Sequence, residues 1–228
     1  MIEEITQTIG EIVSGMDNSI LGTYDPIGDK TDFCATKWAR KGKILTDEDA
    51  FTYSVVSIIY DESIEGLNLF DPLVKMNGNI FLPAPFYIHG TRYATNAEWL
   101  KTDSDLRRKT PIIWLLETTN ETRFGKGDSR LFESDLRIFF LDETNVKDFL
   151  SDDHRREVVY PMQKLAEEFI SVIDGDRSFK RLENYRIKSF SRFGVEDQSG
   201  VFQNILDANL SGVELSLTLT KYRKNCKC

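Results

Sequence analysis

The sequence predicts an α+β fold, in which helices cover one face of a small, mostly antiparallel sheet. The first observation is an apolar stripe at helical spacing within residues 152–173, formed by Val158, Met162, Leu165, Phe169 and Val172. The second is the alternation of apolar and polar residues over 213–220, within the run 213–222, which is typical of a strand with one buried face. The third is the order of elements: strand-like runs at 111–119 and 130–141 precede the helix, and runs at 184–192 and 213–222 follow it.

The predicted helix has recognisable ends and one interruption. Ser151, Asp152 and Asp153 can accept hydrogen bonds from the free N–H groups of its first turn, and Gly175 suits its C-terminal cap. Pro161 removes a backbone hydrogen bond and clashes with the preceding turn. We therefore expect a short helix up to Tyr160 and a longer one that begins at Pro161.

The first 60 residues predict a helix followed by shorter elements. Residues 1–17 form an amphipathic pattern without basic residues, which favours a helix packed on the core over one bound to a membrane. A strand is expected at 31–38, and the basic run 39–43 is a solvated turn or a phosphate contact without a glycine-rich cradle. Thr46 to Asp49 predicts a helical turn capped by Thr46. Residues 53–60 fit a helix or a buried strand, and their β-branched side chains favour the strand.

Residues 66–109 predict a long irregular insertion in a single domain that spans residues 1–228. The segment contains three prolines and the turn signal Asn77-Gly78, and it breaks the rhythm of strands and helices on both sides. Its aromatic residues are candidates for contact with another protein, and the alternative is that they form a small core beneath the loop. These candidate interface residues are Phe81, Phe86, Tyr87, Tyr93 and Trp99.

Composition excludes several classes of protein. The chain has 228 residues, a net charge of −8 and ordinary globular composition, which argues against a general nucleic-acid binder. Its three cysteines, Cys34, Cys226 and Cys228, do not form a disulfide framework. The start of the chain lacks the pattern of a signal peptide, and no run approaches the roughly 20 apolar residues of a membrane span. Synthesis in a reducing cytoplasm is expected.

No motif predicts catalysis, a metal or a cofactor. His154 stands at a helix start, where capping and solvation account for it, and no partner set accompanies it or His89. Cys226 and Cys228 could supply two thiolates, whereas a structural zinc site needs four ligands. Phosphate-binding, dinucleotide-binding and nucleophile-elbow motifs are absent from the sequence. We therefore expect a protein without catalytic or metal-binding residues.

Two stretches of the second half stand out: Val159-Tyr160-Pro161-Met162, followed by Leu165 and Phe169, and the run from Asn209 to Leu215 that leads into the last strand. Through them and the order of elements, residues 1–17 and 111–222 resemble the tail-completion and tail-terminator proteins of tailed bacteriophages. Both stretches look like neck proteins of phages that infect Bacteroidetes, including crAss-like phages. Residues 25–110 depart from the compact pattern of this family.

The resemblance implies a structural virion protein that forms a homomeric ring in the phage neck. Such a head–tail connector joins the portal or adaptor to the tail, contacts other neck, portal or tail rings, and lets DNA pass without sequence-specific binding. Loop 118–129 and segment 194–210, which includes a possible short helix at 201–209, become candidates for contact with the lumen or a neighbouring subunit. They add Phe124, Arg130 and Phe202 to the candidate interface residues.

Two other classes of function remain open from the sequence. One is a soluble interaction module that binds a single protein through the aromatic insertion. The other is a metal-dependent hydrolase or nuclease whose carboxylates converge only in the fold. For the ring protein, the net charge suggests the hypothesis that acidic residues face the DNA channel.

Overall fold

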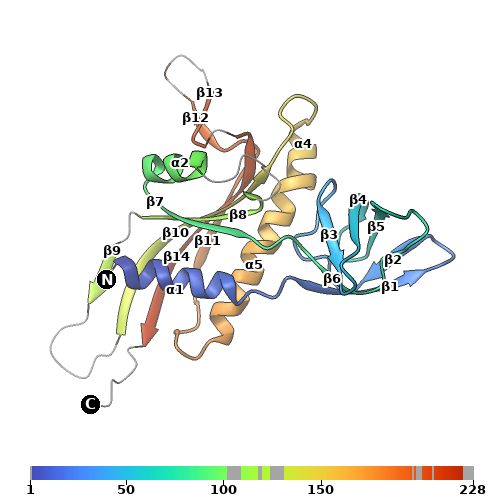
Figure 1. The fold of residues 1–228 in the computed structure, drawn as a ribbon. Helices are drawn as coiled ribbons and strands as arrows, with labels where there is room; N and C mark the ends of the chain where they lie inside the picture. The colour runs from blue at the N-terminus through green and yellow to red at the C-terminus, as the bar shows by residue number, and fades with distance from the viewer. Residues whose placement is uncertain are drawn as a thin grey trace.

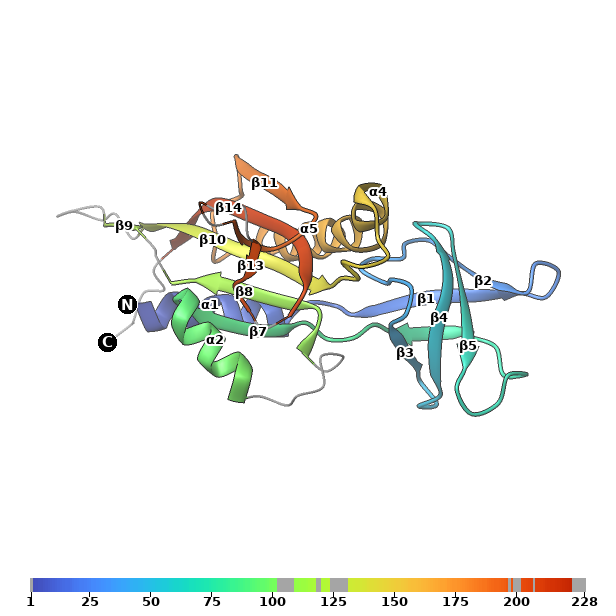
Figure 2. The same ribbon diagram turned by 90° about the horizontal axis from the view of Figure 1, so that it is seen from above.

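A closed β-barrel and a twisted sheet make up the protein. The structure is a computed structural model that describes residues 2–101, 109–117, 120–123, 131–196, 198, 202–206 and 208–222. Figures 1 and 2 show the barrel at one end of the molecule and the sheet with its helices at the other. Strands take up 43% of the described residues, so the predicted α+β class, a small sheet covered by helices, is wrong.

The barrel consists entirely of antiparallel strand pairs. Its order is β1-β2-β5-β4-β3-β6, and β6 pairs with β1 to close it. Closure satisfies the backbone groups that an open sheet would leave free at its edges. The strands are β1 (Ser19–Asp25), β2 (Lys30–Phe33), β3 (Ile44–Asp47), β4 (Thr52–Ile59), β5 (Ser63–Asn68) and β6 (Gly78–Phe81).

The interior of the barrel is filled by side chains from every strand. Alternate residues point inward, so Leu45, Tyr53 and Ile80 are fully buried while their neighbours face outward. Gly22 provides room for this filling, because a Cβ there would lie 2.7 Å or less from the Phe33 ring. The barrel is therefore a packed body without a pore.

Residues 66–109 are not an irregular insertion, because most of the described residues of this segment belong to regular elements. It supplies the end of β5, all of β6, strand β7 (Phe86–Gly90) and helix α2 (Arg92–Lys101). β6 closes the barrel and β7 joins the sheet, so this segment is shared by both parts of the molecule.

The sheet has the order β11-β14-β10-β8-β7, and β9 pairs with one end of β10. β7 and β8 are parallel, whereas the other pairs are antiparallel. The strands predicted at 111–119, 130–141, 184–192 and 213–222 are present as β8, β10, β11 and β14. The remaining strands are β8 (Ile112–Leu116), β9 (Asn120–Arg123), β10 (Leu131–Glu143), β11 (Tyr185–Phe190), β12 (Gly194–Glu196), β13 (Phe202–Asn204) and β14 (Leu210–Tyr222).

Each face of the sheet carries its own hydrophobic cluster. On the inner face, Ile138, Phe140 and Leu215 belong to a core that also contains the long helix and the barrel interior. On the outer face, Trp114 and Phe139 stack with ring centroids 5.1 Å apart and lie in a second cluster with residues from α2 and the chain around β12–β13. Both faces are therefore covered over part of their length, with apolar side chains at alternate positions.

The predicted helices at 1–17 and 152–173 are both present. The first is α1 (Ile2–Ser14); its Thr6 carbonyl accepts a hydrogen bond from the Tyr87 hydroxyl at 2.9 Å. The second is continuous through α4 (Ser151–His154), a π-helical turn, η1 (Arg155–Val159), and α5 (Tyr160–Gly175). The π-helical turn ends just before Pro161, which stands in the first turn of α5. The expected interruption at Pro161 thus takes the form of a local change of helix type.

Two short predicted helices are strands or turns instead. Residues 44–47 form β3, and the Asp47 carboxylate accepts hydrogen bonds from the Asp49 and Phe51 amides in the turn that follows. The predicted helix at 201–209 contains β13, which pairs with β12. The strand favoured at 53–60 is confirmed as β4.

A buried ion cluster joins the barrel to the sheet. Asp142, at the end of β10, has a side chain only 1% exposed, and its carboxylate lies 2.7 Å from Lys43 Nζ and 3.2 Å from Arg40 Nη1. Both basic residues belong to the segment between β2 and β3, and Lys43 Nζ also donates to Thr110 Oγ1 at 2.6 Å. Burial by itself would raise the pKa of Asp142, but the charges of Arg40 and Lys43 hold that pKa below its ordinary value.

Asp142→Asn should lower the free energy of unfolding at neutral pH by about 3–5 kcal/mol, because it leaves two buried cations without their counter-ion. The folded-state pKa of Asp142 is depressed, so its stabilising contribution is present above the unfolded value of about 4 and is lost as pH falls through the folded value. Urea unfolding from neutral to acidic pH should therefore show the gap between wild type and variant narrowing on acidification. Asp148→Asn, on an exposed residue, is the control. Equal stability of Asp142→Asn and wild type at neutral pH would contradict the prediction.

Candidate functional site

The outside of the barrel carries many large apolar side chains that the described residues leave exposed. Ile27 is 97% exposed, Leu73 85% and Phe70 80%. We call this set the barrel surface; its members are Leu21, Ile27, Phe51, Val56, Ile59, Leu67, Leu69, Phe70, Leu73 and Phe81. Isolated exposed apolar residues are normal, but ten of the 14 large apolar side chains that are exposed among the described residues lie on the barrel and its loops, which makes its outside a candidate contact surface.

One end of the barrel combines apolar and acidic side chains. The Leu69 amide donates to the Thr52 carbonyl at 3.0 Å, which places the turn between β3 and β4 beside the segment after β5. Figure 2 shows these two segments at the same end of the barrel. We call this the acidic end; its exposed residues are Glu48, Asp49, Phe51, Leu69, Phe70, Asp71 and Leu73. Among the described side chains, none of its three carboxylates has a salt bridge to Lys or Arg.

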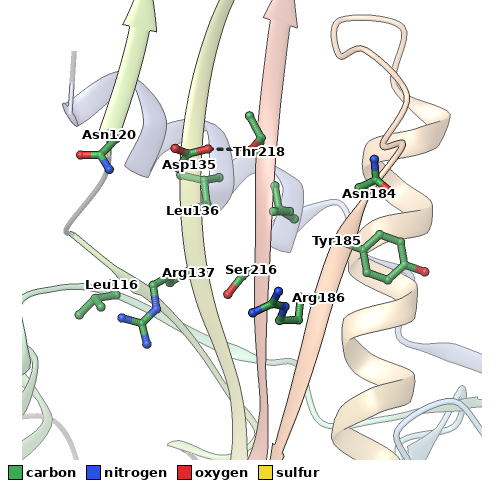
Figure 3. A pocket seen from close by; sticks show the side chains of 11 residues that line it. Leu116, Asn120, Asp135, Leu136, Arg137, Asn184, Tyr185, Arg186, Ser216 and Thr218 are labelled. Atoms are coloured by element: carbon green, nitrogen blue, oxygen red, sulfur yellow. Dashed lines mark hydrogen bonds between the residues drawn. The ribbon is translucent and has the colours of Figure 1, made fainter.

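The outer face of the sheet offers a second surface, a shallow pocket of about 630 Å³ between β9, β10, β14 and β11. Figure 3 shows Arg137 and Arg186 on either side of Ser216. The register explains this row, because Ser216 of β14 is paired with Arg137 of β10 on one side and with Arg186 of β11 on the other. Residues paired across strands project from the same face of a sheet.

The two arginines of this pocket differ in their partners. Arg137 Nε donates to Glu214 Oε1 at 2.5 Å, and this hydrogen bond raises the pKa of the Arg137 guanidinium. Asp135 is also engaged, since it accepts a hydrogen bond from the Thr218 hydroxyl at 2.7 Å. Arg186 is exposed and makes no ion pair with the described residues. Arg137 is thus held by the sheet, whereas Arg186 is available to a ligand.

Arg186 belongs to a basic stretch in an otherwise acidic chain. Residues 177–192 contain six basic residues and one acidic residue, against a net charge of −8 for the whole protein. We call residues 177–192 the basic edge, because the stretch includes β11, the outermost strand of the sheet. Lys180 is paired with Glu183 at 3.0 Å and Lys188 Nζ lies 5.2 Å from the centroid of the Phe190 ring, while both side chains stay exposed.

The structure distributes the candidate interface residues over different environments. Phe81 is part of the barrel surface. Phe86 and Tyr87 of β7 are half-buried against the two cores, and Trp99 of α2 is 2% exposed, with Lys109 Nζ 4.7 Å from its ring centroid. Trp99 therefore belongs to the interior. Tyr93 lies in α2 and Phe202 in β13. Phe124 and Arg130 lie outside the described residues.

Other residues singled out in the sequence take structural positions. His154 is buried, and its Nδ1 lies 2.7 Å from Thr144 Oγ1, so it is a core residue and not a solvated cap. Cys34 is exposed and free. Within the described residues, no group of three or more His, Cys, Asp or Glu side chains could hold a metal ion.

The basic edge is the feature that the sequence reasoning missed. Its signal was the run of basic residues in 177–192, which is visible in the sequence. Residues 184–192 were interpreted only as a strand. Arg137 becomes a neighbour of the basic edge only through the pairing of β10 and β11 with β14.

Comparison with protein-family models, curated proteins and solved structures gave no match. Among the described residues, no helix has both the length and the apolar character required to cross a membrane.

Arg137→Ala should lower the free energy of unfolding by about 1–2 kcal/mol, because Glu214 is mostly buried and loses its charged partner. Arg186→Ala should change it by no more than about 0.5 kcal/mol, because this exposed guanidinium makes no ion pair in the fold. Urea denaturation of both variants measures the difference. A loss for Arg186→Ala as large as that for Arg137→Ala would show that both arginines serve the fold.

Proposed function

We propose that this protein is a structural subunit that assembles into a homomeric ring, as a head–tail connector in the neck of a tailed phage. Copies of the chain contact one another around a DNA channel, and the ring stacks on other neck, portal or tail proteins. Its place of action is the virion, after assembly in the cytoplasm of the bacterial host.

The observation that carries the proposal is the barrel surface. Apolar side chains such as Ile27, Phe70 and Leu73 lie almost wholly in water in the monomer. Removing apolar area from water stabilises an association by about 25 cal/mol per Å², so a partner that covers several of these side chains gains substantially. A subunit whose working state is an assembly is the setting in which such a surface is normally covered.

The resemblance to neck proteins supplies the specific assignment. The stretch Val159-Tyr160-Pro161-Met162 lies where the π-helical turn passes into α5, and the run from Asn209 to Leu215 leads into β14. Both stretches pack in the cores, so the likeness concerns the body that carries the contact surfaces. A net charge of −8 also suits a protein past which DNA slides without binding.

Of the alternatives, an interaction module that works through the aromatic segment has less support. Trp99 is buried, and Phe86 and Tyr87 are partly covered by the protein's own cores. The uncovered apolar side chains of the segment, such as Phe70 and Leu73, belong to the barrel surface, so contact through them is contact through the barrel.

The purified protein should form discrete oligomers, seen by light scattering coupled to size-exclusion chromatography and as rings by negative-stain microscopy. Phe70→Ser combined with Leu73→Ser should weaken self-association by at least about tenfold, because two strongly exposed apolar side chains lose their contacts. Leu150→Ser is the matched control, since Leu150 is 76% exposed but lies outside the barrel. A monomer at every concentration, for wild type and variants alike, would refute the proposed function.

A further inference from the structure

We propose that the basic edge of one copy receives the acidic end of the barrel of the next copy. This inference rests on the proposed function and deepens it, because it names the two surfaces that meet in the ring. The contact joins different faces of identical subunits, which is the head-to-tail geometry that closes into a ring when the rotation between copies permits.

Charge is distributed unevenly along the chain in the way that such a contact needs. Residues 19–82 contain ten acidic residues and six basic ones. Four of the basic residues lie in the segment 37–43 between β2 and β3. Two of these, Arg40 and Lys43, form ion pairs with the buried Asp142. Farther from this junction only Lys30 and Lys75 remain, and both are paired with carboxylates of the barrel itself.

The basic edge is the complementary surface. Arg177, Arg181 and Arg186 are exposed and make no ion pair with the described residues. Arg186 also belongs to β11, which is the last strand of the sheet among the described residues and therefore has one open edge. Opposite potentials on two faces of one molecule steer copies together and fix their orientation.

The acidic end fits the pocket in chemistry as well as in charge. Phe70 and Asp71 are adjacent and exposed, so the same tip presents a flat aromatic ring and a carboxylate. The pocket has a volume of about 630 Å³, more than an aromatic side chain occupies, and its walls carry the guanidinium groups of Arg137 and Arg186. Guanidinium groups stack on aromatic rings and bind carboxylates through paired hydrogen bonds.

The proposal is tested with two charge-reversed variants of the full chain. The edge variant is Arg186→Glu with Lys188→Glu, and the barrel variant is Glu48→Lys with Asp49→Lys. Each alone should weaken self-association by about tenfold or more in sedimentation or light scattering, because like charges then face each other. Lys41→Glu is the control, since it reverses one charge on an exposed residue outside both surfaces.

An equal mixture of the two variants should recover assembly. In the mixture, the acidic edge of one variant meets the basic barrel of the other, and the unaltered basic edge meets the unaltered acidic barrel. Recovery on mixing is specific to a head-to-tail contact between these two surfaces, and circular dichroism of each variant verifies its fold. Self-association of wild type should also weaken at about 1 M salt, where the screening length is about 3 Å.

The outcomes separate the inference from the proposed function. If wild type forms rings that both variants form equally well, the head-to-tail contact is refuted and the ring function stands. If the edge variant assembles normally but loses retention of duplex DNA that wild type binds, the basic edge serves phosphate groups, and the inference is overturned. If wild type never self-associates, both proposals fail.

Discussion

The fold depends on one buried carboxylate. Asp142 lies at the end of β10 and holds Arg40 and Lys43 from the segment between β2 and β3, so this side chain joins the barrel to the sheet. Three charges buried together are stable only when each is paired and hydrogen-bonded, which demands one relative position of the two parts. Lys37 with Glu168 and Asp61 with Lys164 bind the same junction from the side of α5.

The ion pairs of Asp142 fix how the barrel surface is placed relative to the basic edge. The barrel surface and the basic edge belong to different parts of the chain, and an assembly needs them at a fixed distance and angle in every copy. A rigid junction provides that, whereas a flexible link between barrel and sheet would make each contact with a neighbour costly in entropy. In the proposed ring, the buried ions would thus act through geometry, although they lie on neither surface.

The sequence predicted the sheet and the long helix far better than the barrel. β14 and α5 follow periods of two and of about 3.6 over more than ten residues, and these patterns suffice to identify them. The barrel strands are mostly four to eight residues long, and their pairings, such as β1 with β6, join distant positions. Asp47 shows why a local pattern can mislead. Its carboxylate accepts hydrogen bonds from amides of a turn, and the same residue types would also cap a helix. For the basic edge, the excess of basic residues could be seen in the sequence. That Arg186 lies in one row with Arg137 could not, because it depends on the register of β10, β14 and β11.

The way the chain enters and leaves the barrel has an evolutionary consequence. The Leu82 amide donates to the Asn18 carbonyl at 2.9 Å, and Asn18 Nδ2 donates to the Leu82 carbonyl at 2.8 Å. The chain therefore enters the barrel before β1 and leaves it after β6 at adjacent, hydrogen-bonded positions. The barrel is thus inserted into the chain at one place, where an addition needs no second break in the sheet. Its loss would leave Asp142 buried without its two cations, so gain or loss of the barrel requires a matching change at the end of β10.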